Sequence, residues 1–390
     1  MSSHAVTRCR CCLMIKSEAP MTSSTIDFAH MARAIKLAQR GIFTTDPNPN
    51  VGCVIVSTAG EVVGEGWHER AGQAHAEVRA LVQAGERARG ATVYVSLEPC
   101  SHHGRTPPCA DALIAAGVTR VVCAMQDPNP QVSGRGLEQL RNADIVVETG
   151  VLEGEARELN RGFIHRMETG RPWVCVKLAV SLDGRTAMAS GESKWITGAE
   201  ARADVHRLRA ESSAILTGIG TVLADDPRLN ARCDGVADIK QPMRVVADTA
   251  LRLPADAKLI GCDSDSDATA LVYHCSGSPA AIQRIEAAGA AVRQLPRVAG
   301  HLSLEALLDD LGRQGLNNVL VEAGAELNGA LLEAGLINEL VVYQASRVMG
   351  AGAKGMFALQ SVEQMADSIE LTRVEARCVG ADLRLNYRMN

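Results

Sequence analysis

Two short segments carry the side chains that most constrain this chain: HAE, which starts at His75, and EPCSHHGRTPPC, which ends at Cys109. Together they supply the imidazole of His75, the thiols of Cys100 and Cys109, and the carboxylate of Glu77. Zinc held by three protein ligands keeps a fourth position for water, and it lowers the pKa of that water from about 16 to roughly 7. Glu77 would then move protons as a general acid–base. The pattern predicts a catalytic zinc site that removes an amino group from a ring by hydrolysis.

A structural zinc site is the alternative interpretation of the same ligands. Structural sites close with a fourth Cys or His, which His102 or His103 could supply, and they show paired CxxC spacing. The order H-x-E, then P-C, then a second Cys favours catalysis, although eight residues separate Cys100 from Cys109 where the deaminase signature has two. Two further hypotheses remain: another nucleobase deaminase with a degenerate appended domain, and a non-catalytic nucleotide-binding protein stabilised by zinc.

The composition limits the partners and the compartment. At 390 residues the chain is long enough for two domains, and its 46% hydrophobic and 22% charged content is ordinary for a globular protein. A net charge of −5 without an arginine-rich stripe argues against nucleic acid, and no run of 18 apolar residues predicts a membrane span. The twelve cysteines form no compact framework, and thiolate ligands suit a reducing compartment, so we expect a cytoplasmic location.

The first residues differ in composition from the rest. RCRCC at Arg8–Cys12 is basic and rich in thiols, and the apolar stretch after it is too short for a signal peptide. We expect residues 1–25 to be a disordered extension or to precede a translation start at Met21, with a metal-binding tail as the alternative.

Residues 26–170 are predicted to form one α/β domain. Hydrophobic spacing and turn residues predict these elements in order: helix Asp27–Arg40, strands Val51–Thr58 and Glu61–Trp67 as a hairpin, helix Ala74–Ala88, strand Ala91–Leu97, helix Pro107–Ala116, strand Arg120–Met125, a helix and strand within Ser133–Gly150, and helix Glu153–Met167. This alternation predicts a sheet covered on both faces. It also puts His75 and Cys109 near helix N-termini, where the helix dipole favours a thiolate.

A turn-rich GRP sequence at residues 170–172 separates this part from a second α/β domain, residues 171–390. The expected elements are strand Trp173–Ala187 in its apolar part, helix Ala199–Glu211, strands Ala214–Gly218, Arg244–Asp248 and Thr269–His274, helix Leu304–Gln314, strand Asn318–Glu322, helix Asn328–Ala334, and strands Glu339–Ser346 and Ala381–Tyr387. Strands separated by helices predict a mostly parallel sheet with an antiparallel edge. The apolar strand Glu339–Ser346 is a candidate dimer edge.

Two glycine-bearing loops follow strands of the second domain, TGIGTVLADDP at Thr217–Pro227 and EAGAELNGALL at Glu322–Leu332. The second leads into a helix whose N-terminus can receive a phosphate group, and Gly324 lets the backbone approach closely. Neither loop is a full GxGxxG fingerprint, so ordinary tight turns are the alternative.

EPCSHHGRTPPC, with PNPNVG before it and QDPNPQVSGRG after it, resembles the pyrimidine deaminase family of riboflavin biosynthesis. The chain from about Asp27 onward resembles the bifunctional bacterial form, a deaminase fused to a reductase. The resemblance implies an N-terminal cytidine-deaminase-like α/β/α sandwich and a C-terminal dihydrofolate-reductase-like α/β domain. It implies one Zn²⁺ and NADPH as cofactors, a small-molecule phosphoribosyl pyrimidine as substrate, and a homo-oligomer.

The implied reactions are zinc-dependent hydrolytic deamination of 2,5-diamino-6-(5-phosphoribosylamino)pyrimidin-4-one, then NADPH-dependent reduction of the ribosyl chain to ribityl. The resemblance assigns deaminase substrate contacts to Asn48, His68, His102, Arg105, Asp127 and Asn129. It assigns cofactor contacts to Ala179, Trp195, Thr197, Thr221, Asp225, Thr249, Gly324, Ala325, Glu326, Leu327, Asn328, Gly329 and Ala330. It assigns reductase substrate contacts to Lys177, Ser193, Arg209, Leu229, Arg232 and Glu322.

The residue chemistry supports some of these assignments independently. A guanidinium fork pairs with two oxygens of a phosphate, which suits Arg209 and Arg232. Lys177 lies in an apolar strand and must face a polar group; a structural partner, Asp183 or Glu322, is the alternative to substrate. The proton donor of the reduction stays open among Lys177, Asp225 and Glu322.

Overall fold

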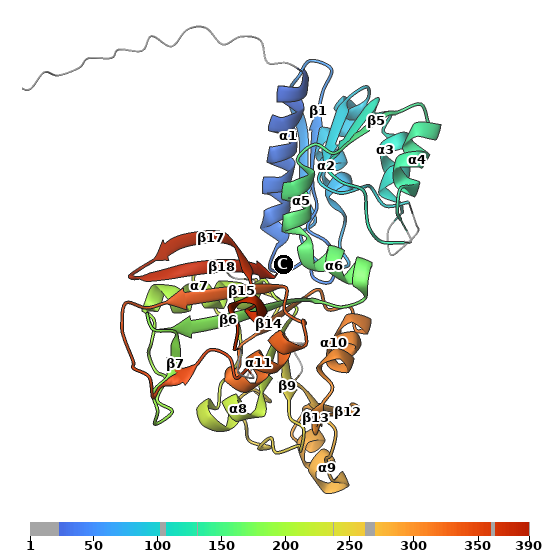
Figure 1. The fold of residues 1–390 in the computed structure, drawn as a ribbon. Helices are drawn as coiled ribbons and strands as arrows, with labels where there is room; N and C mark the ends of the chain where they lie inside the picture. Colours follow the sequence, from blue (N-terminus) through green and yellow to red (C-terminus); the bar gives the residue numbers. More distant parts are fainter. Residues whose placement is uncertain are drawn as a thin grey trace, which may run out of the picture.

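The computed structural model describes residues 23–101, 107–130, 132–236, 238–261, 270–359 and 363–389. Two separate β-sheets, one in each half of the chain, organise the molecule (Figure 1). The expected disordered extension, residues 1–25, lies outside the described residues as far as residue 22, and its last three residues are instead the first of a helix that begins at Ser23. Within the described ranges, no helix has both the length and the apolar character that a membrane crossing requires.

The first half is a five-stranded sheet between helices. Its strands are β1 (Gly52–Val56), β2 (Val62–Trp67), β3 (Thr92–Val95), β4 (Arg120–Cys123) and β5 (Val146–Thr149). Its helices are α1 (Ser23–Ala38), η1 (Gln39–Gly41), α2 (Ala76–Ala84), η2 (Gly85–Ala88), α3 (Cys109–Ala115), α4 (Arg135–Asn142), α5 (Glu153–Leu159) and α6 (Arg161–Thr169). The strand order is β2-β1-β3-β4-β5, with β1 antiparallel to both neighbours and the other pairs parallel.

Alternate side chains of the buried strands enter two different cores, which makes this half a sandwich. Cys53 and Ile55 of β1 pack with α2, α3 and α4, whereas Val54 and Val56 pack with α1, α5 and α6. Figure 1 shows α1 and α5 on one side of the sheet and α3 and α4 on the other. Helix α2 packs so closely on β2 that a Cβ on Gly66 would come within 2.3 Å of the Ala76 carbonyl oxygen. The glycine therefore lets the start of α2, where the candidate site lies, pack directly against β2.

The second half is a nine-stranded sheet. Its strands are β6 (Trp173–Val180), β8 (Ala214–Gly218), β9 (Met243–Ala247), β10 (Ala270–His274), β11 (Ala291–Gln294), β14 (Asn318–Val321), β15 (Glu339–Gln344), β17 (Leu371–Val379) and β18 (Asp382–Met389). Its helices are α7 (Ala199–Ala210), α8 (Ile219–Asp225), α9 (Pro279–Ala287), α10 (Leu304–Arg313), α11 (Ala325–Glu333) and η3 (Met365–Asp367). Two small ribbons pair β7 (Arg185–Ala187) with β16 (Lys354–Gly355), and β12 (Arg297–Val298) with β13 (His301–Leu302).

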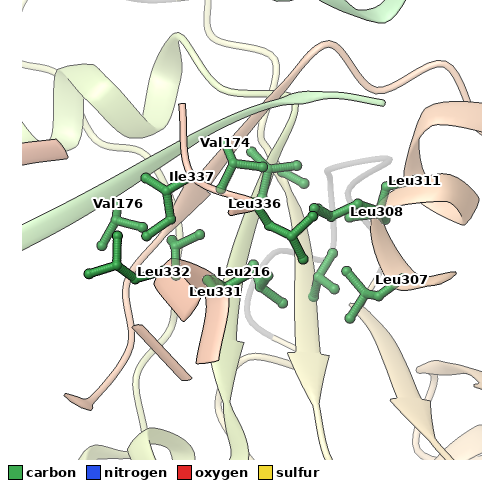
Figure 2. Close-up of a cluster of buried hydrophobic side chains, with 14 of the residues drawn as sticks. Val174, Val176, Leu216, Leu307, Leu308, Leu311, Leu331, Leu332, Leu336 and Ile337 are labelled. Atoms are coloured by element: carbon green, nitrogen blue, oxygen red, sulfur yellow. The ribbon is translucent and has the colours of Figure 1, made fainter. Parts of the chain in front are cut away.

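The strand order of the large sheet is β11-β10-β9-β8-β14-β6-β15-β18-β17. Every pairing from β11 through β15 is parallel, and β18 and β17 add an antiparallel edge, as the sequence predicted. Figure 2 shows one face of this sheet, where Val174 and Val176 of β6 lie near Leu331 and Leu332 of α11 and the leucines of α10 complete the cluster.

Three predictions for this half need correction. Strand β15 lies between β6 and β18, so the stretch Glu339–Ser346 is not an edge of the sheet; on that side the outer strand is β17. Thr217–Pro227 is not a loop, because α8 begins at Ile219 directly after β8. Helix α11 begins at Ala325, three residues before the predicted start, with Gly324 in extended conformation as its N-cap.

One helix of the first half also differs from the prediction. Glu153–Met167 forms two helices, α5 and α6, because the backbone of Asn160 leaves the helical region between them. The side chain of Asn160 bonds the backbone of Asn50, with Nδ2 donating to the carbonyl oxygen at 3.0 Å and Oδ1 accepting from the amide at 2.7 Å. The break thus ties α5 and α6 to the loop before β1.

Candidate functional sites

The three predicted zinc ligands meet in the first half. His75 is the N-cap residue of α2, Cys100 follows the end of β3, and Cys109 is the first residue of α3. The Nδ1 atom of His75 lies 3.5 Å from the Cys100 Sγ and 3.3 Å from the Cys109 Sγ, and all three ligand atoms lie within 4.8 Å of one another. Tetrahedral zinc with bonds of about 2.0–2.3 Å needs neighbouring ligand atoms roughly 3.5–3.8 Å apart. The donor set therefore fits zinc.

The environment of the thiols favours a thiolate. A hydrogen bond with Cys109, and a further one with His75, lower the pKa of Cys100 to about 4, although burial opposes the shift. The amide of Cys109 at the start of α3 also donates to the Cys100 Sγ, at 3.3 Å. The pKa of Cys109 is raised by the same thiolate and by burial, and that of His75 is raised by its contact with Cys100. A thiolate at Cys100 would favour the binding of a cation in this cluster.

Glu77 lies in the first turn of α2, two residues after His75, with only 3% of its surface exposed. Burial, and then the charge of Cys100, raise the pKa of Glu77 to about 7. Its Oε2 atom is buried without a hydrogen-bond partner in the described part of the chain. A buried carboxyl with a free oxygen beside three metal ligands suits proton transfer rather than structural support.

Two of the expected substrate contacts lie beside the ligands. The Nδ2 atom of Asn48 is 3.1 Å from Nε2 of His68, and the ring of His68 stands edge-on to the ring of His75, with 5.3 Å between centroids.

Asp127 is buried and accepts a hydrogen bond from the Asn129 amide at 2.8 Å. Burial raises the pKa of Asp127 to about 6.

His102 and Arg105, the other two expected contacts, lie outside the described residues, as does His103, the other candidate for a fourth ligand.

Sequence reasoning missed Glu98, which organises the segment after β4. Its buried carboxylate accepts hydrogen bonds from the amides of Asp127 at 3.1 Å, Gly134 at 2.9 Å and Gly136 at 2.9 Å. Glu98 thereby ties the segment that carries Asp127 to the segment that carries Cys100. A buried carboxylate needs hydrogen-bond donors around it. The position of Glu98 directly after a buried strand was therefore the feature of the sequence that could have indicated its structural role.

A cavity of about 2070 Å³ opens in the second half at the carboxyl ends of the parallel strands. Ligands of open parallel sheets bind at that edge. Every residue expected to contact the reductase substrate lines the cavity, and so do all the expected cofactor residues except Asn328 and Gly329.

These two residues face the protein instead. Asn328 is fully buried and its Nδ2 donates to the carbonyl oxygen of Ala323 at 3.1 Å. A Cβ on Gly329 would come within 2.3 Å of the carbonyl oxygen of Ala358. Both residues therefore hold the helix in place while Gly324, at its N-terminus, faces open space and leaves room for a phosphate group.

Glu322 organises the polar end of this cavity. Its carboxylate pairs with Lys177 Nζ at 3.2 Å and, through both oxygens, with the Arg209 guanidinium at 2.5 and 3.0 Å. Burial acts to raise the pKa of Glu322, but the charges of Lys177 and Arg209 lower it to about 2. Glu322 is therefore an anion at neutral pH, which removes it from the candidate proton donors. The structural partner of Lys177 is Glu322 and not Asp183, whose carboxylate binds Ser181 and the backbone at residues 349 and 350.

The fold and the sites define a class of protein: a sandwich with a zinc-type His-Cys-Cys cluster and a buried carboxyl, joined to an α/β domain with a cavity of cofactor size. Residues 24–125 match the family model described as the cytidine and deoxycytidylate deaminase zinc-binding region, and residues 172–385 match the RibD C-terminal domain.

Relatives cover nearly the whole chain. Riboflavin biosynthesis protein RibD of Escherichia coli strain K12 is 50% identical over 370 residues, covering 92% of this chain and 98% of that protein. The protein of the same name from Haemophilus influenzae is 46% identical, covering 93% and 98%. The solved structure of Acinetobacter baumannii RibD, form 2, is 44% identical with a TM-score of 0.87, covering 95% of this chain and all of that one. The chain belongs to the RibD family.

Proposed function

We propose that this chain catalyses two successive steps of riboflavin biosynthesis on one metabolite. A solved relative from Thermotoga maritima, 32% identical with a TM-score of 0.81, is titled a diaminohydroxyphosphoribosylaminopyrimidine deaminase/5-amino-6-(5-phosphoribosylamino)uracil reductase. The chain carries the corresponding deaminase and reductase domains, and is a bifunctional enzyme of that pathway. The observation that carries the proposal is the convergence of His75, Cys100 and Cys109 beside the buried carboxyl of Glu77.

In the deaminase site, His75, Cys100 and Cys109 would hold the zinc ion. Zinc bound there supplies a Lewis acid that activates water near neutral pH. Glu77 accepts a proton from the attacking water and delivers protons to the ring nitrogen and to the departing ammonia, so that water enters as ammonia leaves. Burial raises the pKa of its carboxyl above the ordinary value, which suits a group that both accepts and donates a proton in one cycle.

The remaining deaminase contacts orient the substrate. We assign Asn48 and His68 to the pyrimidine side of the site, because the ring of His68 lies against the ring of His75 and the side chain of Asn48 is paired with His68. Asp127 and Asn129 are proposed as further contacts from the segment that Glu98 holds. His102 and Arg105 stay proposals from the sequence, with Arg105 meeting the ribose phosphate.

In the reductase site, the cavity residues, with Gly324 at the N-terminus of α11 for a phosphate group, would hold NADPH, which when bound supplies a hydride for the anomeric carbon. Glu322 holds the ammonium of Lys177 and the guanidinium of Arg209 in place. Since Glu322 is ionised, the proton for the opened sugar comes from Lys177 or Asp225. Arg232 lines the cavity with Nη2 3.2 Å from His206 Nε2, which leaves its other nitrogens for a substrate phosphate.

Two broader assignments complete the proposal. We place the domain boundary near residue 170, between α6 and β6. The match to the deaminase family model ends at residue 125, and the match to the reductase family model begins at residue 172. We further propose that the enzyme works as a homo-oligomer in the cytoplasm, where the thiols of Cys100 and Cys109 stay reduced, and that it binds neither nucleic acid nor membrane.

A coupled assay tests the function. The purified full-length protein, loaded with zinc, is given the diaminopyrimidine substrate, and ammonia release is measured with and without NADPH. We expect ammonia without NADPH, and one NADPH oxidised per ammonia when the cofactor is present. Ammonia release that requires NADPH, or NADPH oxidation that starts before any ammonia appears, would contradict the proposed order of reactions.

A further inference from the structure

The loop between η1 and β1, residues 42–51, belongs to the deaminase half but is bound by the other half through Asp46. The Asp46 Oδ1 atom accepts hydrogen bonds from Ser213 Oγ at 2.7 Å and Asn317 Nδ2 at 3.1 Å. Its Oδ2 atom pairs with Lys240 Nζ at 2.9 Å. All three donors come from the second half of the chain, 167 to 271 residues away.

Two of these three residues, Lys240 and Asn317, also bind the backbone of the same loop. Lys240 donates from Nζ to the Asp46 carbonyl oxygen at 3.0 Å and from its amide to the Phe43 carbonyl oxygen at 3.0 Å. Asn317 Nδ2 also donates to the Pro47 carbonyl oxygen at 2.9 Å. Ser213 and Asn317 are themselves buried. We call this set of contacts the Asp46 clasp; it holds the loop by both its side chain and its main chain.

The clasp lies two residues from the deaminase site. Asn48, whose side chain is paired with His68 at 3.1 Å, also donates from its amide to the Thr45 carbonyl oxygen at 2.8 Å, which closes a tight turn around Asp46. Pro47 lies between Asp46 and Asn48, and its ring fixes one of the few backbone torsions between the clasp and the site. A movement of Asp46 would therefore be carried to Asn48 with little absorbed by the loop.

The donors of the clasp stand far from the reductase cavity. Ser213 and Asn317 precede the first residues of β8 and β14, whereas the cavity is lined from the opposite ends of these strands, by Gly218 and Glu322. Lys240 is likewise absent from the cavity lining. Removing the clasp should therefore disturb the deaminase site without changing a group that touches the reductase ligands.

We propose that Asp46 is a positioning residue of the deaminase site, held by Ser213, Lys240 and Asn317 so that the reductase domain completes the substrate-binding loop of the deaminase. The proposal rests on the proposed deaminase function and on the assignment of Asn48 to substrate binding. Under this proposal the reductase domain catalyses reduction and also positions a substrate-binding loop for deamination.

The variant Asp46→Ala in the zinc-loaded full-length protein tests this. Loss of a substrate-orienting contact that acts before and during the reaction raises KM more than it lowers kcat. We expect KM for deamination to rise about tenfold or more, with kcat within about threefold of wild type, because small displacements of binding groups have effects of that size. Zinc content and reduction of the separately supplied deaminated intermediate should equal those of the wild type.

Two comparisons separate positioning from general loosening of the interface. Glu158→Gln removes a different ion pair between the same halves, Arg388 Nη2 to Glu158 Oε1 at 2.6 Å, together with the pair of Glu158 with Arg161 inside the first half. It should leave the deaminase KM unchanged. Adding Asp46→Ala to Asn48→Ala should raise KM no further than Asn48→Ala alone, since both act through one side chain.

If Asp46→Ala does not fold, Lys240→Met serves as the test variant, because Lys240 is exposed and its backbone amide still donates to Phe43. The KM for deamination should rise in this variant as well. An unchanged KM in the variant used, an equal rise in Glu158→Gln, or additive effects with Asn48→Ala would overturn the role of Asp46. A wild-type enzyme that releases no ammonia would instead overturn the proposed function.

Discussion

Replacing Glu322 with glutamine should destabilise the second domain strongly and in a pH-dependent way. Glu322 is 10% exposed and is the shared anionic partner of Lys177 and Arg209. A pKa lowered from 4.5 to about 2 corresponds, at 1.36 kcal/mol per pKa unit, to about 3 kcal/mol of stabilisation at neutral pH. Removing one member of a buried ion pair costs about 3–5 kcal/mol in other proteins, which agrees in size. We therefore expect Glu322→Gln to lower the free energy of unfolding by about 2–4 kcal/mol.

The pH dependence follows from the direction of the shift. A carboxyl whose folded-state pKa is depressed stabilises the protein above its unfolded pKa, and this stabilisation is lost as pH falls through the folded pKa. The difference between wild type and Glu322→Gln should be full at pH 7, begin to shrink near pH 4.5 and approach zero towards pH 2. Glu326→Gln, which changes an exposed carboxyl on the next helix, should show no such difference.

Hydrogen–deuterium exchange in increasing urea, read in peptides from β6 and β14, measures the stability of the second sheet separately from the first. Equal unfolding free energies for wild type and Glu322→Gln at pH 7 would refute the account of this ion-pair cluster. A difference that grows as the pH falls would refute the sign of the shift.

Three other predictions concern metal, packing and ion pairing. Removing zinc with a chelator should abolish ammonia release while NADPH oxidation with the deaminated intermediate persists; loss of both activities would contradict separate sites. Arg120→Ala should destabilise the first domain by about 2–4 kcal/mol in urea unfolding, because Arg120 binds the buried Asp27 with two hydrogen bonds of 2.8 Å; Arg120→Lys should lose less. Gly329→Ala should weaken NADPH binding, measured by calorimetry, because its Cβ would come within 2.3 Å of a backbone oxygen. Gly154→Ala, in α5 of the first domain with open space around it, should bind NADPH normally. Equal affinities for the two variants would show that α11 can shift without consequence.

The order of strands and helices was largely predictable, because local patterns determine it. His75, Cys100 and Cys109 could be assigned to one cluster since their positions at helix starts and a strand end bring them to the same edge of a sheet. The antiparallel partner β17 was missed because nearly all of its residues are exposed, so no alternation of apolar side chains marks it.

Contacts between distant residues were not predictable in the same way. No local pattern shows that Asp46 is bound by Lys240 and Asn317, because the chain must fold before these side chains meet. The break at Asn160 arises from its bonds to Asn50, 110 residues away, which compete with the continuous helix that spacing alone favours. Tertiary contacts decided both features.

The central claim is that one chain carries two active sites with separate catalytic groups, and that Glu77 serves only the first. The variant Glu77→Gln keeps the size of the side chain and removes its ability to carry protons, while His75, Cys100 and Cys109 are unchanged. The most direct measurement compares ammonia release from the diaminopyrimidine with NADPH oxidation by the supplied deaminated intermediate, in zinc-loaded wild type and variant. The account predicts normal zinc content, a loss of deamination of at least 10²-fold, as expected for a general acid–base, and reduction at the wild-type rate. Deamination within a few-fold of wild type, or loss of both activities in a folded protein, would contradict it.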